Sequence, residues 1–430
     1  MKHILFFAFL TATTAFGQNW PQWRGPTADG ISTEKSLPVR WSKTENIAWR
    51  APLEGQGTST PVIWGDSIFL TSQMGDGPYE GRSRDFDDAA VARRTGSRGQ
   101  VQFAVQAFDR RNGKLLWDYR LDAEGVLQPV HIKHNLASPS CITDGERVYA
   151  WFGTGQLVAL NMAGKLIWQR HLGKEIAPFD VLWGHGSSPA LYKETLLMLC
   201  DHPPGAYLLS LDKRTGKERW RKDRGKEKRS YTTPFVVSVA GHDELILNSS
   251  ERVDAVDPTT GELLWWTGEP NRVPVPTPVF HDGVLYLNRG YSSSPYLALK
   301  PGGHGDASSR VQWEVKTGGP YVSSLLYYQG LLYMANERGI VSTSDAATGE
   351  TLWKERFGSV FSASPVAADG KVYLVNEEGI TFVLASGKEK KVLAENALGE
   401  RILASPAISG GGIFFRSDQS LICVRVESKP

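Results

Sequence analysis

The stretch Ala255-Val256-Asp257-Pro258-Thr259-Thr260-Gly261-Glu262-Leu263-Leu264-Trp265 recurs, with variations, through a chain of 430 residues. Asp side chains accept hydrogen bonds from backbone N–H groups two residues on, and Gly accepts the positive φ that a tight turn requires. A Trp four residues after the Gly supplies a large ring to bury and an N–H to satisfy. The motif therefore predicts a hairpin corner followed by a strand whose Trp covers a neighbouring sheet.

Further copies keep most of these positions. They are built on Asp109-Gly113-Trp117, Asn161-Gly164-Trp168 (one residue shorter), Asp212-Gly216-Trp220 and Asp345-Gly349-Trp353. Another copy keeps Ala298 and Trp313 around a longer loop. The Thr-Gly pairs are predicted to be turns and not phosphate loops. We expect structural docking roles for Trp49, Trp117, Trp168, Trp220, Trp265, Trp313 and Trp353.

A second marker, a small residue followed by Pro, also repeats. Its copies are Thr60-Pro61, Ser138-Pro139, Ser188-Pro189, Thr233-Pro234, Thr277-Pro278, Ser324-Leu325 (Leu in place of Pro), Ser364-Pro365 and Ser405-Pro406. Most successive copies lie roughly 40–50 residues apart, which is the period of propeller blades. The first interval is longer, and we assign residues 73–100 to an insertion in the first blade. That glycine-containing loop of mixed charge is either a lid or partner-docking segment, or a solvated loop.

Each marker leads into alternating apolar segments joined by turns such as Asp282-Gly283 and Asp369-Gly370, a strong hairpin signal. Four short strands per repeat and eight repeats predict an all-β, eight-bladed β-propeller with four-stranded antiparallel blades. The last repeat lacks the Trp motif, whereas residues 46–50 supply an unassigned strand. We predict that this N-terminal strand completes the last blade and closes the ring, which removes exposed sheet edges.

Residues 1–17 are predicted to be a signal peptide, followed by a single domain over 18–430. Met1-Lys2-His3 is basic, an apolar run follows, and Ala15-Phe16-Gly17 offers small residues before a mature start near Gln18. The alternative is a buried N-terminal helix. The run is too short for a permanent transmembrane segment, and the chain shows no other. We expect an exported bacterial protein, periplasmic or secreted and monomeric.

Charge and cysteine content exclude several classes of protein. Lys and Arg number 48 against 46 Asp and Glu, a net charge of +2, so nucleic acid is not an expected partner. The basic run 213–229 is interpreted as a strand and a hairpin corner with a solvated face. Cys141, Cys200 and Cys423 are odd in number, widely spaced and set in or beside apolar runs, so they are predicted to be buried and unpaired.

These motifs resemble the tryptophan-docking repeats of pyrroloquinoline-quinone (PQQ)-binding-like β-propellers. That superfamily contains the quinoprotein alcohol dehydrogenases and an outer-membrane β-barrel assembly lipoprotein. The stretches 20–26 (WPQWRGP), 134–139 (HNLASP) and 361–365 (FSASP) are also similar to parts of exported bacterial repeat proteins of this kind. The resemblance covers essentially the whole mature chain and implies fold and export more than activity, since one fold hosts many functions. No Cys follows the apolar run, unlike in a lipoprotein.

The resemblance also implies a possible cofactor, PQQ with calcium. Quinoprotein alcohol dehydrogenases carry a disulfide between adjacent cysteines and a calcium ion held by Glu, Asn and Asp. This sequence has no adjacent cysteines, and that acidic set has no matching motif here. No cofactor is therefore established, and PQQ with calcium is kept as an alternative.

One end of a propeller channel is ringed by the loops that enter each inner strand and by the hairpins opposite them, and such a funnel is the default binding site. The ligand-binding candidates on this rim are His134, Asn135, Trp183, His185, Asp201, Tyr231, Arg289, Tyr321, Glu337, Arg338, Glu377 and Arg401. A metal shared by His134, His185 and Asp201 is less favoured than rim histidines bonded to backbone. Glu337, Arg338 and Glu377 either orient a substrate or form surface ion pairs, and no metal ligand or catalytic residue is assigned.

The complete blade pattern, together with the lack of a recognisable catalytic motif, favours an exported non-catalytic scaffold. Its partner at the channel face is a protein, a glycan or a small ligand. The alternatives are a PQQ-dependent oxidoreductase acting on alcohols or sugars, and a lyase or hydrolase built on the rim.

Overall fold

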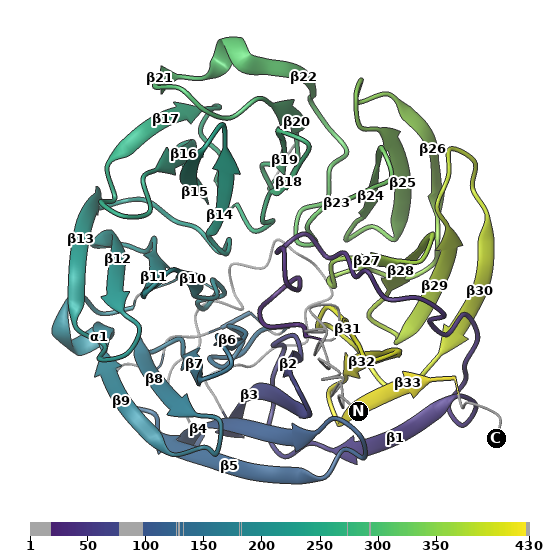
Figure 1. Cartoon of the computed structure of the whole chain (residues 1–430), viewed down its shortest axis with the longest axis horizontal. Helices are drawn as coiled ribbons and strands as arrows, with labels where there is room; N and C mark the ends of the chain where they lie inside the picture. Colours follow the sequence, from purple (N-terminus) through teal and green to yellow (C-terminus); the bar gives the residue numbers. More distant parts are fainter. Residues whose placement is uncertain are drawn as a thin grey trace, which may run out of the picture.

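The computed structural model describes residues 19–76 and 98–426, apart from residues 126, 128, 129, 132, 180, 182, 273, 292 and 293. The described strands form eight sheets arranged radially around one axis (Figure 1). This arrangement confirms the predicted eight-bladed propeller of four-stranded antiparallel blades. Among the described residues no helix is long and apolar enough to cross a membrane. The predicted signal peptide lies outside the described residues.

The first four blades follow one another along the chain. Blade 1 holds β2 (Val62–Trp64), β3 (Ser67–Asp76), β4 (Arg98–Asp109) and β5 (Leu115–Asp122). Blade 2 holds β6 (Ile142–Thr143), β7 (Arg147–Trp151), β8 (Gln156–Asn161) and β9 (Leu166–His171), and the short helix α1 (Leu172–Glu175) follows it. Blade 3 holds β10 (Ala190–Tyr192), β11 (Thr195–Cys200), β12 (Ala206–Asp212) and β13 (Glu218–Gly225). Blade 4 holds β14 (Phe235–Val239), β15 (His242–Asn248), β16 (Val253–Val256) and β17 (Leu263–Thr267).

The other four blades complete the circle. Blade 5 holds β18 (Val279–His281), β19 (Val284–Asn288), β20 (Tyr296–Leu299) and β22 (Val311–Val315), with β21 (Gly305–Asp306) and the 3₁₀ turn η3 (Ser308–Arg310) before β22. Blade 6 holds β23 (Leu326–Tyr328), β24 (Leu331–Ala335), β25 (Ile340–Asp345) and β26 (Thr351–Arg356). Blade 7 holds β27 (Val366–Ala368), β28 (Lys371–Val375), β29 (Ile380–Ala385) and β30 (Val392–Ala397). Blade 8 holds β31 (Ala407–Ser409), β32 (Gly412–Arg416) and β33 (Ser420–Arg425), with β1 (Ile47–Pro52) as its outer strand.

Blade 8 joins the two ends of the chain. Strand β1 pairs antiparallel with β33, with Arg50 opposite Ile422 and Ala51 opposite Leu421. The outer edge of the last three strands is therefore covered by the first strand of the chain. This pairing confirms the predicted closure of the ring.

The core lies between blades because both faces of each inner strand are buried. Along β8, Val158 and Leu160 pack against blade 1, whereas Leu157 and Ala159 pack against blade 3. Side chains alternate between the two faces of a strand, so a strand covered on both sides is apolar throughout. All three cysteines are free and buried, as predicted.

The Trp motif joins five of the blades to the next one around the ring. Trp168 at the outer edge of blade 2 donates its indole N–H to the Lys213 carbonyl of blade 3 at 3.0 Å. Its ring covers Gly216, where an added Cβ would lie 2.7 Å from a ring carbon. The same docking joins Trp49 to Gly113, Trp117 to Gly164, Trp220 to Gly261 and Trp313 to Gly349. The motif is thus a repeated contact between blades, as the sequence predicted.

Two of the predicted docking residues behave differently. The indole of Trp265 donates to Glu244 within its own blade at 2.8 Å. The long blade 5 loop instead adds β21 as a parallel fifth strand on β17. The buried indole N–H of Trp353 has no hydrogen-bond partner among the described residues. Neither following blade carries the Asp-x-x-Thr-Gly corner, so these two indoles lack the usual acceptor.

Residues 19–46 cross one end of the channel before the chain reaches β1. Trp20 pairs with Ile63 of blade 1 through two backbone hydrogen bonds of 2.8 Å. The Arg24 guanidinium, buried at 1% exposure, donates to the Leu325 carbonyl of blade 6 at 2.9 Å. Ala367 of blade 7 donates to the Gly30 carbonyl. Figure 1 shows this segment, in purple, running from the centre over β27 and β28 to the rim.

The predicted insertion in blade 1 starts and ends in strand. Strand β3 continues to Asp76, which pairs with Arg98 at the start of β4. Both ends of the segment 73–100, predicted to be loop, are therefore strand, and its middle lies outside the described residues.

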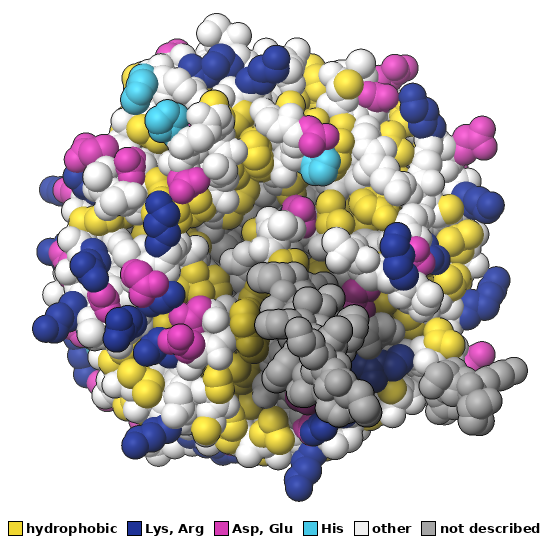
Figure 2. All heavy atoms as spheres, viewed as in Figure 1, with side chains coloured by type: hydrophobic (Ala, Val, Ile, Leu, Met, Phe, Trp, Pro, Cys, Tyr) yellow, Lys and Arg dark blue, Asp and Glu magenta, His cyan; other side chains and the backbone are white. Residues whose placement is uncertain are grey.

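On the face drawn in Figure 2, side chains of both charges are interspersed around the rim, which agrees with the net charge of +2.

Candidate functional site

One hydroxyl per blade stands two residues before each innermost strand. We call this set the hydroxyl ring: Thr60, Ser140, Ser188, Thr233, Thr277, Ser324, Ser364 and Ser405. In seven blades the backbone N–H of the ring residue donates to the hydroxyl of the next blade, at 2.9 to 3.1 Å. The Thr60 hydroxyl has no partner among the described residues, so no such bond joins blade 8 to blade 1. The Pro after most ring residues removes one backbone donor from the channel wall.

The ring corrects one sequence marker. In blade 2 the ring residue is Ser140, which is followed by Cys141, and not the predicted Ser138 of Ser138-Pro139. Ser138 lies two residues earlier, where its hydroxyl accepts a hydrogen bond from Thr58 at 2.7 Å. Ser138 is followed by Pro and Ser140 is followed by Cys, so the sequence marker selected Ser138.

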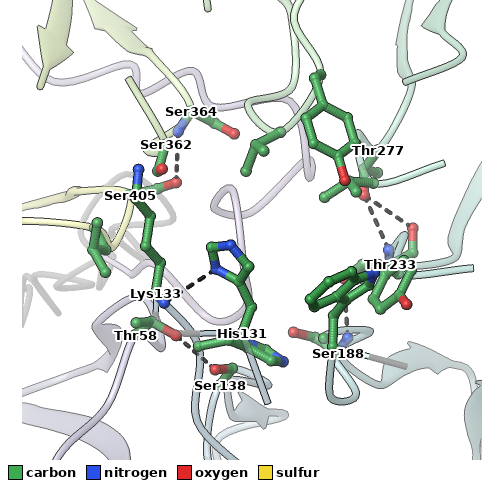
Figure 3. A pocket seen from close by; sticks show the side chains of 18 of the residues that line it. Thr58, His131, Lys133, Ser138, Ser188, Thr233, Thr277, Ser362, Ser364 and Ser405 are labelled. Carbon is green, nitrogen blue, oxygen red and sulfur yellow. Dashed lines mark hydrogen bonds between the residues drawn. The ribbon is translucent and has the colours of Figure 1, made fainter. Parts of the chain in front are cut away.

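A cavity of about 370 Å³ opens along the axis on the side of the entering loops. Its wall includes a second ring, formed two residues before each hydroxyl-ring residue by Thr58, Ser138, Gly186, Tyr231, Val275, Val322, Ser362 and Leu403. Trp23 is the one described lining residue that comes from the N-terminal crossing segment. Figure 3 shows His131 and Lys133 reaching into the cavity across from Thr233 and Thr277. The cavity therefore combines all eight blades with the segment that crosses the channel.

Four of the predicted rim residues line this cavity: His134, Trp183, Tyr231 and Tyr321. The imidazole of His134 hydrogen-bonds the His185 carbonyl at 3.1 Å, and burial lowers its pKa to about 4. Trp183 has a φ of 76°, an uncommon and strained backbone angle for a bulky residue. Burial raises the pKa of Tyr321 to about 12. These imidazole and phenol groups are therefore uncharged at neutral pH.

Three other predicted residues are buried behind the wall. Asn135 accepts the Ala137 N–H at 2.9 Å and so closes a turn. His185 lies edge-on to Trp151 with ring centroids 4.2 Å apart, and burial holds its pKa well below the usual value. Arg289 donates to the Asn248 side chain, and burial lowers its pKa to about 10. None of the three lines the cavity, so these residues support its wall.

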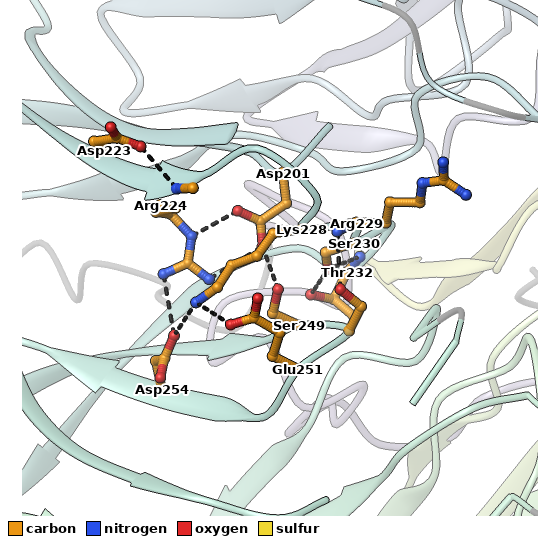
Figure 4. Close-up of polar contacts among 12 residues, drawn as sticks. Asp201, Asp223, Arg224, Lys228, Arg229, Ser230, Thr232, Ser249, Glu251 and Asp254 are labelled. Atoms are coloured by element: carbon orange, nitrogen blue, oxygen red, sulfur yellow. Dashed lines mark hydrogen bonds and ion pairs between the residues drawn. The ribbon is translucent and has the colours of Figure 1, made fainter. Parts of the chain in front are cut away.

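Asp201 belongs to a buried ion-pair network between blades 3 and 4 (Figure 4). Its carboxylate accepts two hydrogen bonds from Arg224, at 2.6 and 3.1 Å. Arg224 and Lys228 both reach Asp254 at 3.3 Å. Burial disfavours the Asp254 carboxylate, but these cations outweigh it and hold its pKa below the usual value. The predicted solvated face of 213–229 is therefore wrong at its C-terminal end, where charges are buried.

The last four predicted residues form contacts at the edge of the cavity. Glu377 pairs with Lys133 at 2.8 Å, and Glu337 accepts the Tyr321 N–H at 3.1 Å. Arg338 lies 4.0 Å from Glu337, and Arg401 lies 3.4 Å from Asp418. Among the described residues no cluster of three or more His, Cys, Asp and Glu is arranged to hold a metal.

Several lining residues were absent from the sequence candidates: Trp23, His131, Lys133, Arg229, Arg272 and Tyr291. Arg229 and Arg272 stand four and five residues before a hydroxyl-ring Thr; the first shares its entering loop with the candidate Tyr231, whereas the loop of Arg272 supplied no candidate. Extending the rule of entering loops by a few residues would have found both. Trp23 had no such signal, because its place depends on the path of the N-terminal segment.

The superfamily implies a quinone and a calcium ion, and the cavity wall suits the quinone better than the calcium. Trp23 and Trp183 are aromatic surfaces suited to a planar ring. Calcium prefers carboxylate and carbonyl oxygens, and none of the described lining residues is Asp, Glu or Asn. The described wall therefore does not fit the calcium of a quinoprotein dehydrogenase.

Comparison with known proteins places the chain. A family model described as outer membrane protein assembly factor BamB matches residues 32–177, 101–287 and 303–415. Tetrathionate hydrolase from Acidithiobacillus ferrooxidans is 26% identical over 344 residues, which cover 72% of this chain and 61% of that protein. The chain thus spans less than two thirds of the length of this curated relative.

Two solved structures share the fold. BamB from Moraxella catarrhalis has a TM-score of 0.59 at 14% identity, covering 88% of this chain and 98% of that one. A europium-containing methanol dehydrogenase has a TM-score of 0.50 at 13% identity, covering 86% and 89%. Identities this low show the fold alone. With the family match over more than half of its length, the chain belongs to the BamB family of PQQ-binding-like β-propellers.

Proposed function

We propose that this chain is a non-catalytic propeller scaffold that holds a small ligand in the cavity at the mouth of its channel. The cavity itself carries the proposal: about 370 Å³ of space at the axis, bounded by one residue of every blade and by Trp23. A concave site with a few converging polar groups is the usual form of a small-molecule site. A rigid ring of blades presents such a site without needing to rearrange.

Binding is favoured over chemistry because the carboxylates near the cavity are engaged in ion pairs. Glu377 is paired with Lys133, and Asp201 is paired with Arg224. The hydroxyls of Ser188 and Thr277 accept backbone N–H groups of the preceding blade. These contacts hold the wall together, which supports a scaffold role.

A cavity-filling substitution tests the proposal. The Cβ of a side chain at Gly186 would meet nothing closer than 3.7 Å, and its backbone does not require Gly. Gly186→Phe is therefore expected to fill the cavity while the blades still fold. The matched control is Gly205→Phe, since Gly205 has similar room and does not line the cavity.

The measurement is a thermal-shift screen of small organic molecules, followed by calorimetry. A ligand at a hundredfold excess over its Kd stabilises the folded state by about 2.7 kcal/mol. We expect hits that stabilise the wild type and Gly205→Phe but not Gly186→Phe. Hits that stabilise all three proteins equally would place binding outside the cavity and overturn the proposal.

The oxidoreductase alternative is tested in the same preparation. PQQ and calcium are added to the purified protein, and dye reduction is followed with alcohols and sugars as donors. Turnover by the wild type that Gly186→Phe abolishes would show that the chain is an enzyme and would overturn the scaffold proposal. An unchanged absorbance spectrum and no dye reduction would support the scaffold.

A further inference from the structure

The second ring of the cavity wall is divided into two unlike arcs. On the consecutive blades 4, 5 and 6 it presents Tyr231, Val275 and Val322. Elsewhere the second ring is mostly small and polar: Ser362, Thr58, Ser138 and Gly186, with Leu403 between Ser362 and Thr58. A ligand that fills this space therefore meets an apolar surface on one side and hydroxyls on the other.

Two arginines stand beside the apolar arc. Arg229 lies two residues before Tyr231, and Arg272 lies three residues before Val275. Both line the cavity, and the structure gives neither an ion-pair partner among the described carboxylates. The other rim cations are compensated, as Lys133, Arg401 and Arg338 each lie within 4.0 Å of a carboxylate. The uncompensated positive charge of the site is thus concentrated on blades 4 and 5.

The same anchor positions both arginines. Ser250 in the β15–β16 loop accepts the Arg229 N–H on its hydroxyl and donates its own N–H to the Arg229 carbonyl, both at 3.0 Å. Its carbonyl accepts the N–H of Asn271, next to Arg272. The Tyr231 N–H also donates to the Pro274 carbonyl at 3.0 Å, which ties the two loops directly.

The buried ion pairs of Figure 4 fix this anchor from behind. Lys228, the neighbour of Arg229, is held by Asp254, and Ser249, the neighbour of Ser250, donates to Asp201 at 2.5 Å. The guanidinium of Arg229 points away from this network in Figure 4. The backbone that carries it is therefore set before a ligand arrives, which lowers the entropic cost of binding.

Resting on the proposed small-ligand function, we infer that the ligand is an amphipathic organic anion. Its acid group binds between Arg229 and Arg272, and its apolar body lies along Tyr231, Val275 and Val322. Guanidinium groups bind carboxylate, sulfonate and phosphate with charge-assisted hydrogen bonds, and these are stronger than neutral ones. No Asp or Glu is among the described wall residues, and the nearby Glu377 is paired with Lys133, so carboxylate repulsion against such an anion is small.

Calorimetry with three probes separates the charge from the apolar body. Octanoate carries both, 1-octanol carries the chain alone, and sulfate carries the charge alone. We expect octanoate to bind about tenfold or more tightly than 1-octanol, because hydrogen bonds to charged groups contribute about 1.5–3 kcal/mol each. We expect it also to bind more tightly than sulfate, because sulfate has no apolar chain to bury. Octanol binding as tightly as octanoate would overturn the inference and leave the small-ligand function standing.

Substitutions then assign each half of the ligand. Arg229→Gln and Arg272→Gln are each expected to weaken octanoate about tenfold or more and to leave octanol unchanged. The control is Arg214→Gln, at an exposed hairpin corner of blade 3 outside the cavity. Octanoate affinity unchanged in both cavity variants would overturn the role of the arginines.

The apolar arc is tested by Val275→Thr with Val322→Thr, which keep shape and add hydroxyls. This double variant is expected to weaken octanoate several-fold while butyrate changes less. Equal loss for both acids would overturn the role of the arc. Octanoate binding that survives Gly186→Phe would place it outside the cavity and overturn the inference together with the proposed function.

Discussion

At the scale of single residues, the glycine of each Trp motif is needed for two reasons. Gly216 has a φ of 70°, and its missing Cβ leaves the space that the Trp168 ring occupies. Turns elsewhere need only the first property: Gly241 has a φ of 84° and no neighbour within 4 Å. The recurring Gly-x-x-x-Trp spacing is therefore a packing requirement between blades and not a ligand-binding motif.

We expect Gly216→Ala to destabilise the fold by about 2–4 kcal/mol, because it adds a clash with Trp168 to the cost of a positive φ. Gly241→Ala carries only the backbone cost of a positive φ, about 1–2 kcal/mol. Urea unfolding of both variants measures the difference. Equal losses would mean that the indole moves aside freely.

Histidine burial predicts sensitivity to acid. The pKa of His134 is about 4 in the folded chain, against about 6.5 when unfolded. A lowered folded pKa means that the unfolded state takes up the proton first as the pH falls. The contribution of His134 is therefore complete above pH 6.5 and is lost between pH 6.5 and 4, by about 3 kcal/mol.

The free energy of unfolding is compared at pH 7.5 and 4.5. His134→Gln is expected to lose less stability over this range than the wild type. His242→Gln, in an exposed hairpin, is the control and is expected to follow the wild type. A His134→Gln slope equal to that of the wild type would contradict the assignment.

At the scale of elements, the sequence motifs predicted the turns and strands that depend on residues close together in the chain. Each repeat is marked by Asp-Gly turns, Trp corners and Ser/Thr-Pro pairs. Together these markers specify four strands per repeat, and four strands make one blade. Ser138-Pro139 misled because a neighbouring Ser-Pro imitated the true position at Ser140. The rule of entering loops found His134 and Tyr231 but not Arg229, whose backbone is held by Ser250 in the β15–β16 loop of the same blade.

The hydroxyl ring makes a prediction at this scale. Thr277→Val leaves the part-buried N–H of Thr233 without its acceptor and is expected to cost about 1 kcal/mol. Thr60→Val removes a buried hydroxyl that has no partner among the described residues and is expected to be neutral or slightly stabilising. Chemical denaturation of the pair tests whether the ring is cohesive, and a neutral Thr277→Val would show that it is not.

At the scale of the whole molecule, the N-terminal residues serve three purposes. Residues 19–46 cross the channel, Trp23 lines the cavity, and β1 closes the ring. The repeats predicted the closure, because the last blade lacked a strand. They gave no sign of the crossing, whose contacts reach blades 1, 6 and 7 and depend on the completed fold.

Deletion separates these contributions. A chain that starts at Asn19 keeps all of these contacts and is expected to be monomeric and cooperative in unfolding. A chain that starts at Glu54 loses buried Trp20, Trp41 and Trp49, each worth roughly 2 kcal/mol or more, and exposes the edge of β33. Light scattering after size exclusion is expected to show self-association of the shorter chain only. A monomeric, stable shorter chain would contradict the role of closure.

The closure of blade 8 has a consequence for the order of folding. Arg24 and its acceptor Leu325 are 301 residues apart, and β1 waits for β33 at the far end of the chain. Blades 1 to 7 form mostly from neighbours in sequence, whereas contacts of such long range are slow to form. We therefore expect the docking of the first segment to be the last folding event. Before this docking, the outer edge of β33 and one end of the channel are uncovered, and unpaired strand edges favour aggregation. We therefore expect the chain to be more prone to aggregation during folding than after it.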